Sequence, residues 1–400
     1  MVVRTTGQQN EPVAMMADTL HILTLTPFYP TRADDAGGCF VAEPLGWLAK
    51  IGVQNTVFAV QPAYRGTVQA AKRGVPARWL RYFALPGGFG LPTAGAFVFA
   101  RIVAALRELN SRQRIDLIHA HGALPCGHAA MLLSQELKIP FVVSVHGLDV
   151  FSTVQVGGPS GHWCRRISQR TYAASRRVIC ISERVREQVL EGMGRTCRTS
   201  VVYNGVDPEF FSPGSETAPE EPIVLSVGNL IPSKGHELTI RAVVALAAEF
   251  SALRFEIIGN GPGLSRLQSL AQQLQIDERA RFLGRQSRQQ VADAMRRCTV
   301  FALPSRYEGL GCVYLEAMAA AKPVIGCRGQ GIAEVIRHGS NGFLVGSENE
   351  RELTLALGML LRDVPSRWNL GVAARDTILG RFTLEQQAER LARIYREVVA

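Results

Sequence analysis

Long hydrophobic runs are missing from this chain of 400 residues. No stretch approaches the roughly 18 uncharged apolar residues that a membrane-spanning helix needs. Residues 1–18 contain no apolar core of the kind found in secretory signals, so we expect a loose tail before the first strand. These absences favour a cytoplasmic protein.

Paired cysteines are missing as well. The eight cysteines are scattered, and none lies in a CxxC pair or at the spacing of a zinc site. Several sit in apolar runs, such as Cys180 in VICIS, and we expect them to be reduced core residues. Because no acidic pair of the DxD type occurs either, we expect no metal site and no cofactor.

A complete dinucleotide fingerprint is also lacking. The stretch FEIIGNGPG, residues 255–263, lacks the third glycine at the required spacing, and no acid closes a following strand in the right place. This excludes the usual nicotinamide-dependent dehydrogenases. The tight turn at Gly259 can still line a nucleotide site.

Positive charge is plentiful but unevenly placed. Through residue 206 the chain has 22 Lys and Arg against 12 Asp and Glu, whereas from residue 207 onward both counts are 22. A basic first half favours an anionic partner such as a membrane surface, and the alternative is a solvated face. No basic-aromatic recognition motif occurs, so we expect no nucleic-acid binding.

Short apolar runs rich in β-branched residues alternate with helix-period segments in both halves of the chain. Apolar runs with little alternation are typical of strands buried on both faces of a parallel sheet. We therefore predict an α/β protein with two Rossmann-like, doubly wound domains that face each other across a cleft. The predicted parts are a tail (1–18), a first domain (19–205), a second domain (206–382) and a C-terminal helix (383–400), with a polar linker rich in Pro and Glu near 205–221. Thr383 and Gln386 resemble a capping box at the start of the C-terminal helix, and residues 124–137 are among the segments expected to be helical.

Strand ends in the second half carry the strongest chemical signals. In VGNLIPSKG, Gly228 and Gly235 permit tight turns, and Lys234 stands at a helix start, an arrangement that suits a phosphate. An ordinary surface lysine is the alternative for this motif alone.

The stretch CTVFALPSRYEGLGCVYLEAMA reads as a strand, a loop over 305–311 and a helix from about 312 to 320. Amides at the helix start can hold a diphosphate, and Glu308 and Glu316 would flank it and accept hydrogen bonds from hydroxyls. A nucleotide sugar fits this pattern, although Glu316 alone could be a surface acid. The residues of this predicted donor loop are Gly309, Leu310, Gly311, Cys312 and Val313.

Two histidines and a glycine pair mark strand ends in the first half. His121 and His146 are each followed by glycine, and Gly37 and Gly38 follow the first strand. Their positions place them at the cleft edge, where they could contact phosphate or sugar, although ordinary turn or core roles remain open.

These motifs, in this order, resemble the retaining glycosyltransferases of family 4, also called glycosyl transferases group 1, which have the GT-B fold. Bacterial envelope and exopolysaccharide members are the most similar. The matching segments span about 20 to 345 and include AGGCFVAEPLGWLAKIG, DLIHAHGALPCG, VVSVHGLDV, VGNLIPSKGHELTIRA, IIGNGPGLSRLQSLA, FALPSRYEGLGCVYLEAMAAAKPVIG and GIAEVIRHGSNGFLV.

The resemblance implies roles for individual residues. Glu308 and Glu316 match the family's E-x7-E pair, in which the first acid faces the donor sugar and the second bonds the ribose. Lys234 matches the diphosphate-binding lysine, and His146 matches the active-site histidine. The family's companion arginine falls at Asn229, so another cation must replace it, with Arg306, Arg285 and Arg32 as alternatives. Glu334 matches a common family acid of unassigned role, which could contact acceptor or sugar.

The resemblance implies transfer of a sugar from a nucleoside diphosphate sugar to a hydroxyl of a lipid-linked or polysaccharide acceptor. It also implies that no metal is needed and that the C-terminal helix packs back on the first domain. The apolar loop FALPGGFGLPTAGAFVF, residues 83–99, and the first half's arginines suggest docking on the inner face of the plasma membrane. A GT-B sugar-nucleotide epimerase, a sugar phosphorylase and a non-catalytic sugar-binding subunit are the alternatives.

Overall fold

The computed structural model describes residues 19–70, 74–88, 90–151, 156–194, 197–214 and 221–400. The tail expected over residues 1–18 and part of the linker expected after residue 205 lie outside these ranges. Within them, no helix is both long enough and apolar enough to cross a membrane.

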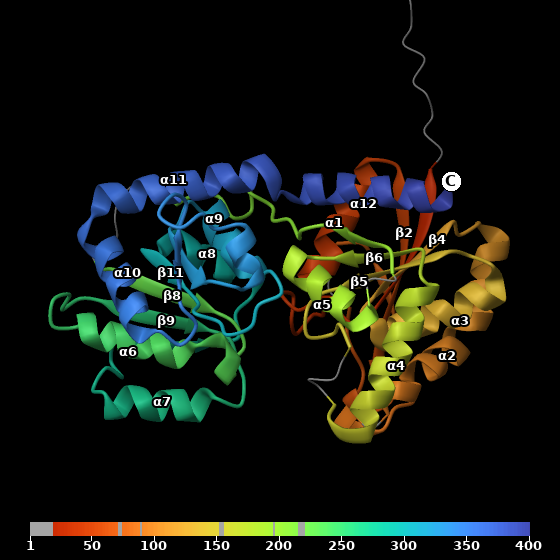
Figure 1. Ribbon diagram of the computed structural model, residues 1–400, viewed down its shortest axis with the longest axis horizontal. Helices are drawn as coiled ribbons and strands as arrows, with labels where there is room; N and C mark the ends of the chain where they lie inside the picture. Colours follow the sequence, from red (N-terminus) through yellow and green to blue (C-terminus); the bar gives the residue numbers. More distant parts are fainter. Residues whose placement is uncertain (1–18, 71–73, 89, 152–155, 195–196, 215–220) are drawn as a thin grey trace, which may run out of the picture.

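Two parallel β-sheets, each covered by helices, form the two halves of the molecule (Figure 1). The first sheet has the strand order β3-β2-β1-β4-β5-β6-β7, and the second has the order β10-β9-β8-β11-β12-β13. All seven residues of β1, LHILTLT, are buried, as expected for a strand covered on both faces. The predicted pair of doubly wound parallel sheets is therefore confirmed.

The first domain begins with the strand β1 (Leu20–Thr26). Its other described strands are β2 (Val53–Pro62), β3 (Ala77–Tyr82), β4 (Leu117–His121), β5 (Phe141–Val145), β6 (Arg177–Cys180) and β7 (Thr199–Val201). Its described helices are α1 (Cys39–Lys50), α2 (Leu91–Arg112), α3 (His128–Leu137), α4 (Gly158–Ala174) and α5 (Glu183–Met193).

The second domain repeats this alternation. Its described strands are β8 (Ile223–Val227), β9 (Arg254–Ile258), β10 (Ala280–Gly284), β11 (Val300–Ala302), β12 (Val324–Cys327) and β13 (Phe343–Val345). Its described helices are α6 (His236–Leu246), α7 (Leu264–Gln273), α8 (Arg288–Arg297), α9 (Cys312–Ala319), α10 (Glu350–Arg362) and α11 (Val364–Arg381).

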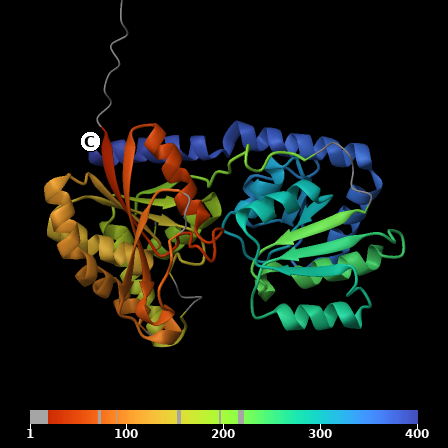
Figure 2. The ribbon, with the colours of Figure 1, turned by 180° about the vertical axis from the view of Figure 1, so that it is seen from behind.

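The last helix, α12 (Leu384–Val399), returns to the first domain. Figures 1 and 2 show α11 and α12 following one another along the same edge of the molecule, α11 over the second domain and α12 over the first. Leu391 and Tyr395 of α12 join Val41 and Leu45 of α1 in one buried cluster. The helix begins with the expected capping box, in which Thr383 and Gln386 each accept a hydrogen bond from the other's backbone.

One predicted helix begins later than expected. The segment 124–137 reads as a helix from its apolar spacing, but α3 begins only at His128. Leu124 has an extended backbone, with φ −128° and ψ 138°, because the residue before a proline avoids helical angles. The chain therefore turns irregularly over residues 123–127 before it enters α3.

Candidate functional site

Lys234 and Glu308 form an ion pair between two loops at the carboxyl ends of β8 and β11. Lys234 Nζ lies 2.5 Å from Glu308 Oε2, and both side chains are largely buried. Gly235 makes this approach feasible, because it has φ +72° and a Cβ there would lie 2.2 Å from the carbonyl oxygen of Pro304. The predicted phosphate-binding cation and the predicted sugar-facing acid are thus neighbours.

The N-terminus of α9 opens beside this pair. Gly311 precedes the helix with φ +87°, and a Cβ on it would lie 2.9 Å from Cγ of Glu308. The first amides of a helix have no partner within it and carry the positive end of its dipole. Because Glu316 lies one turn further inside and is buried, the acids flank a helix tip that can hold an anion.

Glu316 is held by Arg288, the first residue of α8. Arg288 Nη1 donates to Glu316, while its Nη2 lies 2.7 Å from Oε1 of Glu43 on α1. The guanidinium also stacks on Phe211, with its carbon 4.7 Å from the ring centre. Burial alone disfavours the charged form, but the neighbouring acids, Glu316 foremost, outweigh it and raise the pKa of Arg288. Arg288 thus joins the two domains at the candidate site.

Three further contacts close the domains on each other. Arg285 pairs with Asp34, and Ser182 Oγ donates to the carbonyl oxygen of Gly309 at 2.6 Å. A Cβ on Gly309 would lie 2.6 Å from the carbonyl oxygen of His146, so this loop position has room only for glycine. The predicted donor loop therefore abuts the predicted active-site histidine directly.

Glu334, a residue of the second domain, lies against the N-terminus of α5 in the first domain. Its carboxylate accepts hydrogen bonds from the amides of Glu183 and Arg184, both at 2.8 Å, and from the Tyr203 hydroxyl at 2.9 Å. Both carboxylate oxygens of Glu334 therefore accept hydrogen bonds from the first domain, and the carboxylate caps α5. A contact between Glu334 and a sugar or acceptor stays a prediction.

The histidines at the strand ends form a buried stack. His121 Nδ1 lies 3.1 Å from His146 Nε2, and the rings are nearly parallel, with centres 5.3 Å apart. The ring of His119 also lies next to that of His121, with ring centres 4.3 Å apart. Burial lowers the pKa of His119 and His146 to about 3 each, and it also lowers that of His121. The rings are therefore neutral near pH 7.

A cavity of about 630 Å³ lies next to His146 in the first domain. It runs from Gly37 and Gly38 at the cleft to the end of β3, and Asp149 forms part of its wall. Asp149 Oδ1 accepts from the amide of His146 at 2.8 Å, whereas Oδ2 is buried with no hydrogen-bond partner among the described residues. Burial, opposed by backbone amides, raises the pKa of Asp149 to about 6.

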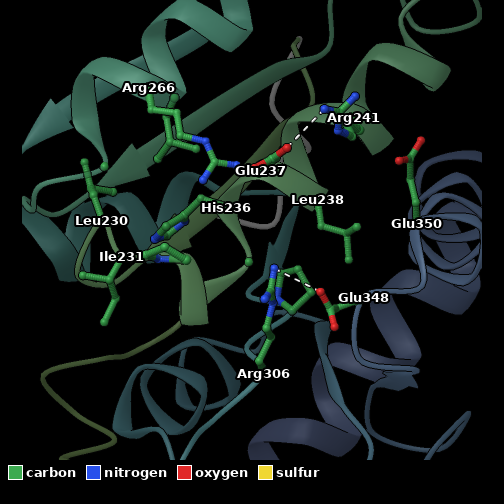
Figure 3. Close-up of a pocket in the computed structure, with 15 residues that line it drawn as sticks. Leu230, Ile231, His236, Glu237, Leu238, Arg241, Arg266, Arg306, Glu348 and Glu350 are labelled. Carbon is green, nitrogen blue, oxygen red and sulfur yellow. Dashed lines mark hydrogen bonds and ion pairs between the residues drawn. The ribbon is translucent and has the colours of Figure 1, made fainter. Parts of the chain in front are cut away.

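A second cavity, of about 340 Å³, lies on the second domain around the start of α6 (Figure 3). Arg241 pairs there with Glu237, and Arg306 pairs with Glu348. Neither Lys234 nor either acid of the E-x7-E pair lines it. Its three arginines face three glutamates, so their formal charges balance.

The remaining predicted residues lie around the same cleft. Gly38 precedes α1 with φ +77°, and a Cβ on Gly259 would lie 1.9 Å from the carbonyl oxygen of Gly228. Asn229 contributes its carbonyl oxygen to His236 Nε2 at 3.3 Å, and Leu310 is fully buried. Cys312 Sγ accepts from Asn204, and burial raises its pKa to about 12, so its thiol is protonated at neutral pH. Val313 is partly buried against the core.

The sequence reasoning missed Arg288. The three arginines proposed to replace the family arginine at Asn229 have other partners: Arg285 bonds Asp34, Arg306 bonds Glu348 and Arg32 bonds Gln69. A contact between one of them and the diphosphate stays a prediction. A signal for Arg288 was present, because Ser287 and Gln290 form a capping box that puts this cation in a helix's first turn. Cations are unfavourable there, so such an arginine needs acidic partners.

The chain matches two family models that together cover most of its length. Residues 40–210 match "Glycosyltransferase Family 4" and residues 208–377 match "Glycosyl transferases group 1". An uncharacterized glycosyltransferase of Methanocaldococcus jannaschii is 30% identical, over 73% of this chain and 78% of its own length. A D-inositol 3-phosphate glycosyltransferase of Nocardia farcinica is 31% identical, over 92% of this chain and 87% of its own length.

Solved structures share the fold at lower identity. Sucrose-phosphate synthase from Thermosynechococcus elongatus superposes with a TM-score of 0.75 at 20% identity, covering 95% of this chain and 99% of its own. HepE of Anabaena in complex with UDP-glucose gives 0.70 at 19%, covering 94% and 100%. The two facing doubly wound domains are those of the GT-B fold, as predicted, and the chain belongs to the family 4 glycosyltransferases.

Proposed function

We propose that this glycosyltransferase moves a sugar from a nucleoside diphosphate sugar to a hydroxyl of a lipid-linked or polysaccharide acceptor, with retention of the anomeric configuration. The proposal rests chiefly on the 2.5 Å pair of Lys234 and Glu308 beside the tip of α9. HepE, which shares the fold, has been solved with UDP-glucose, and this supports a nucleotide-sugar donor.

In the proposed reaction, the glycosidic bond to the diphosphate breaks while the sugar acquires oxocarbenium character. Lys234 and the first amides of α9 stabilise the charge that grows on the leaving phosphate, so the protein supplies this stabilisation without a metal. Glu308 exchanges its lysine partner for hydroxyls of the sugar and orients the ring, and Glu316 accepts from the ribose. The acceptor oxygen attacks from the side of the leaving group, whose phosphate takes the acceptor proton.

We further propose that the first domain docks on an anionic membrane surface, on the cytoplasmic side. Phe83 and Phe97 are exposed and pack on each other, with ring centres 5.2 Å apart. Trp163 is exposed on α4, the neighbour of α2, and the same helix carries exposed Arg165 and Arg166. An apolar edge with adjacent cations suits acyl chains below anionic headgroups.

Binding of UDP by calorimetry, followed by turnover with UDP-sugars, tests the transfer proposal. Lys234→Ala should weaken UDP binding about ten- to a hundredfold, because it removes a charged hydrogen-bond donor from the diphosphate. Glu308→Gln should retain UDP binding but lose transfer. Lys50→Ala, at the exposed far end of α1, and Glu136→Gln on the surface serve as matched controls. Unchanged UDP binding by Lys234→Ala would contradict the assignment of Lys234 to the diphosphate. Because the proposed reaction needs no metal, EDTA should leave the rate of transfer unchanged.

A further inference from the structure

The cavity beside His146 has one end near a contact between the two domains. Gly37 and Gly38 form its cleft end, and Asp34, next to them, pairs with Arg285 of the second domain. A molecule bound in this cavity would therefore lie beside a contact between the two domains. Its volume of about 630 Å³ lies within the usual range for small-molecule sites, roughly 300–1,000 Å³.

Aromatic side chains form much of the cavity wall. Phe28 and Tyr29 come from the loop after β1, Tyr64 follows β2, and Trp79 and Tyr82 lie on β3. The indole Nε1 of Trp79 is buried and has no hydrogen-bond partner among the described residues. Such walls combine a flat apolar face with single polar atoms, which matches the apolar faces and outward hydroxyls of a sugar ring.

The cavity offers a buried hydrogen-bond acceptor but little positive charge. Asp149 is only 7% exposed, and its Oδ2 has no partner among the described residues. Gly122 lies beside this oxygen, since a Cβ there would lie 3.4 Å from Oδ2 and 4.0 Å from the Phe28 ring, both ordinary contact distances. Arg65, an exposed residue, is the one cation among the described lining residues.

This charge pattern disfavours an anionic ligand. A phosphate or carboxylate placed near Asp149 would meet another acid whose side chain is buried, and like charges repel more strongly near a buried group than in water. A hydroxyl placed there would instead donate to Oδ2 and satisfy a buried acceptor. The name of the similar Nocardia protein specifies inositol 3-phosphate, an anionic molecule, so inositol 3-phosphate is a suitable competing probe.

Building on the proposed transfer function, we propose that this cavity binds the acceptor as an uncharged sugar unit, with an aromatic wall against the ring and Asp149 Oδ2 accepting one of its hydroxyls. The cavity thereby selects against phosphorylated or carboxylated acceptors. Asp149 acts as a specificity-determining contact and Trp79 as part of the stacking surface.

Binding of matched sugar pairs to the full chain saturated with UDP tests this assignment. The probes are methyl glucoside against glucose 6-phosphate, and myo-inositol against inositol 3-phosphate, each titrated by calorimetry. The neutral member of each pair should bind at least tenfold more tightly. Asp149→Asn keeps the shape and the acceptor for the His146 amide, and it should weaken the neutral ligand about tenfold or more. Trp79→Ala should also weaken it, with Trp79→Phe restoring part of the affinity.

The control is Asp376→Asn, the same substitution at an exposed site on α11, which should change neither ligand. Tighter binding of the phosphorylated members, equal binding of both, or no binding of either neutral sugar at 50 mM would overturn the assignment. Failure of wild-type protein to bind UDP would count against the nucleotide-sugar proposal instead, because the same sugars can be titrated without UDP.

Discussion

Arg288 bonds two acids from different domains with one guanidinium. Nε and Nη2 serve Glu43 of the first domain, and Nη1 serves Glu316 of the second. Because the charge is buried, its hydrogen bonds must be satisfied for the closed arrangement to be stable. Glu316 keeps its second oxygen for a ligand, so Arg288 orients the acid that we expect to bond the ribose.

Arg288→Ala should lower the melting temperature by roughly 6–10 °C. The substitution leaves the buried Glu316 and the partly buried Glu43 without their counter-charge. Such a loss typically costs about 3–5 kcal/mol, at about 2 °C for each kcal/mol in a chain of this size. Arg288→Lys should fall between wild type and alanine, since a lysine cannot make the bidentate contact. Arg351→Ala, an exposed residue on α10, is the control, and an equal shift for both alanine variants would refute the role.

The histidine stack should make stability depend on pH. The pKa values of His119 and His146 fall from 6.5 to about 3 on folding, so between these values the unfolded chain binds more protons. Stability is therefore present above pH 6.5 and lost as the pH falls, by about 1.4 kcal/mol per pH unit for each histidine. Asp149, whose pKa rises from 3.8 to about 6, acts in the opposite direction between those values and offsets one histidine.

Melting temperatures measured from pH 7 down to pH 4.5 test this dependence. His119→Gln should flatten the profile, because it removes one group that gains a proton on unfolding. The exposed His162→Gln should leave the profile as in wild type. A melting temperature that rises as the pH falls over this range would show that the stack does not control the dependence.

For single residues, the sequence could predict contacts between residues of the same sheet. Lys234 and Glu308 follow strands of one sheet, and the ends of parallel strands meet at one edge, so their proximity could be expected. Arg288 could not be predicted in the same way. Its partner Glu43 lies 245 residues away in another domain, and their contact depends on how the domains close.

At the scale of elements, α5 begins under a cap supplied by the other domain. The Ser182 side chain accepts a hydrogen bond from the amide of Val185. The Glu334 carboxylate accepts from the amides of Glu183 and Arg184. A carboxylate at a helix N-terminus also interacts favourably with the helix dipole. The start of α5 is therefore held by residues of both domains.

Glu334→Ala should destabilise this helix start by about 1–3 kcal/mol, because two partly buried amide donors lose their acceptor. Hydrogen exchange should then speed up at the amides of Glu183 and Arg184, with little change in the second half of α5. Glu187→Ala on the exposed face of the same helix is the control. Unaltered exchange at both amides would mean that the cap contributes nothing to the helix.

The start of a helix could be predicted where a capping motif and the helical spacing of apolar residues pointed to the same residue. The box of Thr383 and Gln386 marked the start of α12 from sequence alone. Apolar spacing alone was misleading before α3, because it continues through residues 124–127 although Leu124, which precedes Pro125, avoids helical backbone angles. The acid that caps α5 gave no local signal, since it lies about 150 residues further along the chain.

For the whole molecule, the repeated alternation of strands and helices was enough to predict two facing domains. The sequence could not predict how closely the two domains approach each other, because their approach depends on side-chain contacts between them. Examples are Arg285 with Asp34, and Tyr307 with Gln188 at 3.0 Å. The uneven charge is a further property of the whole molecule: the excess of basic residues lies in the half that also exposes Phe83, Phe97 and Trp163.

This uneven charge predicts binding to anionic vesicles through the first domain. In a sedimentation assay at low salt, the protein should bind phosphatidylglycerol-containing vesicles but not neutral phosphatidylcholine vesicles, and 0.5 M salt should release it. Arg165→Glu with Arg166→Glu should weaken binding about tenfold or more, at about 1 kcal/mol for each cation lost. Phe83→Ser with Phe97→Ser should weaken binding at low salt while leaving the charge unchanged. Leu355→Ser with Met359→Ser, which removes equally exposed apolar side chains from the electrically balanced second domain, is the matched control. Equal binding to neutral vesicles, or an effect of the control pair as large as that of the phenylalanine pair, would assign membrane contact elsewhere, because only the first domain combines exposed aromatic rings with surplus positive charge.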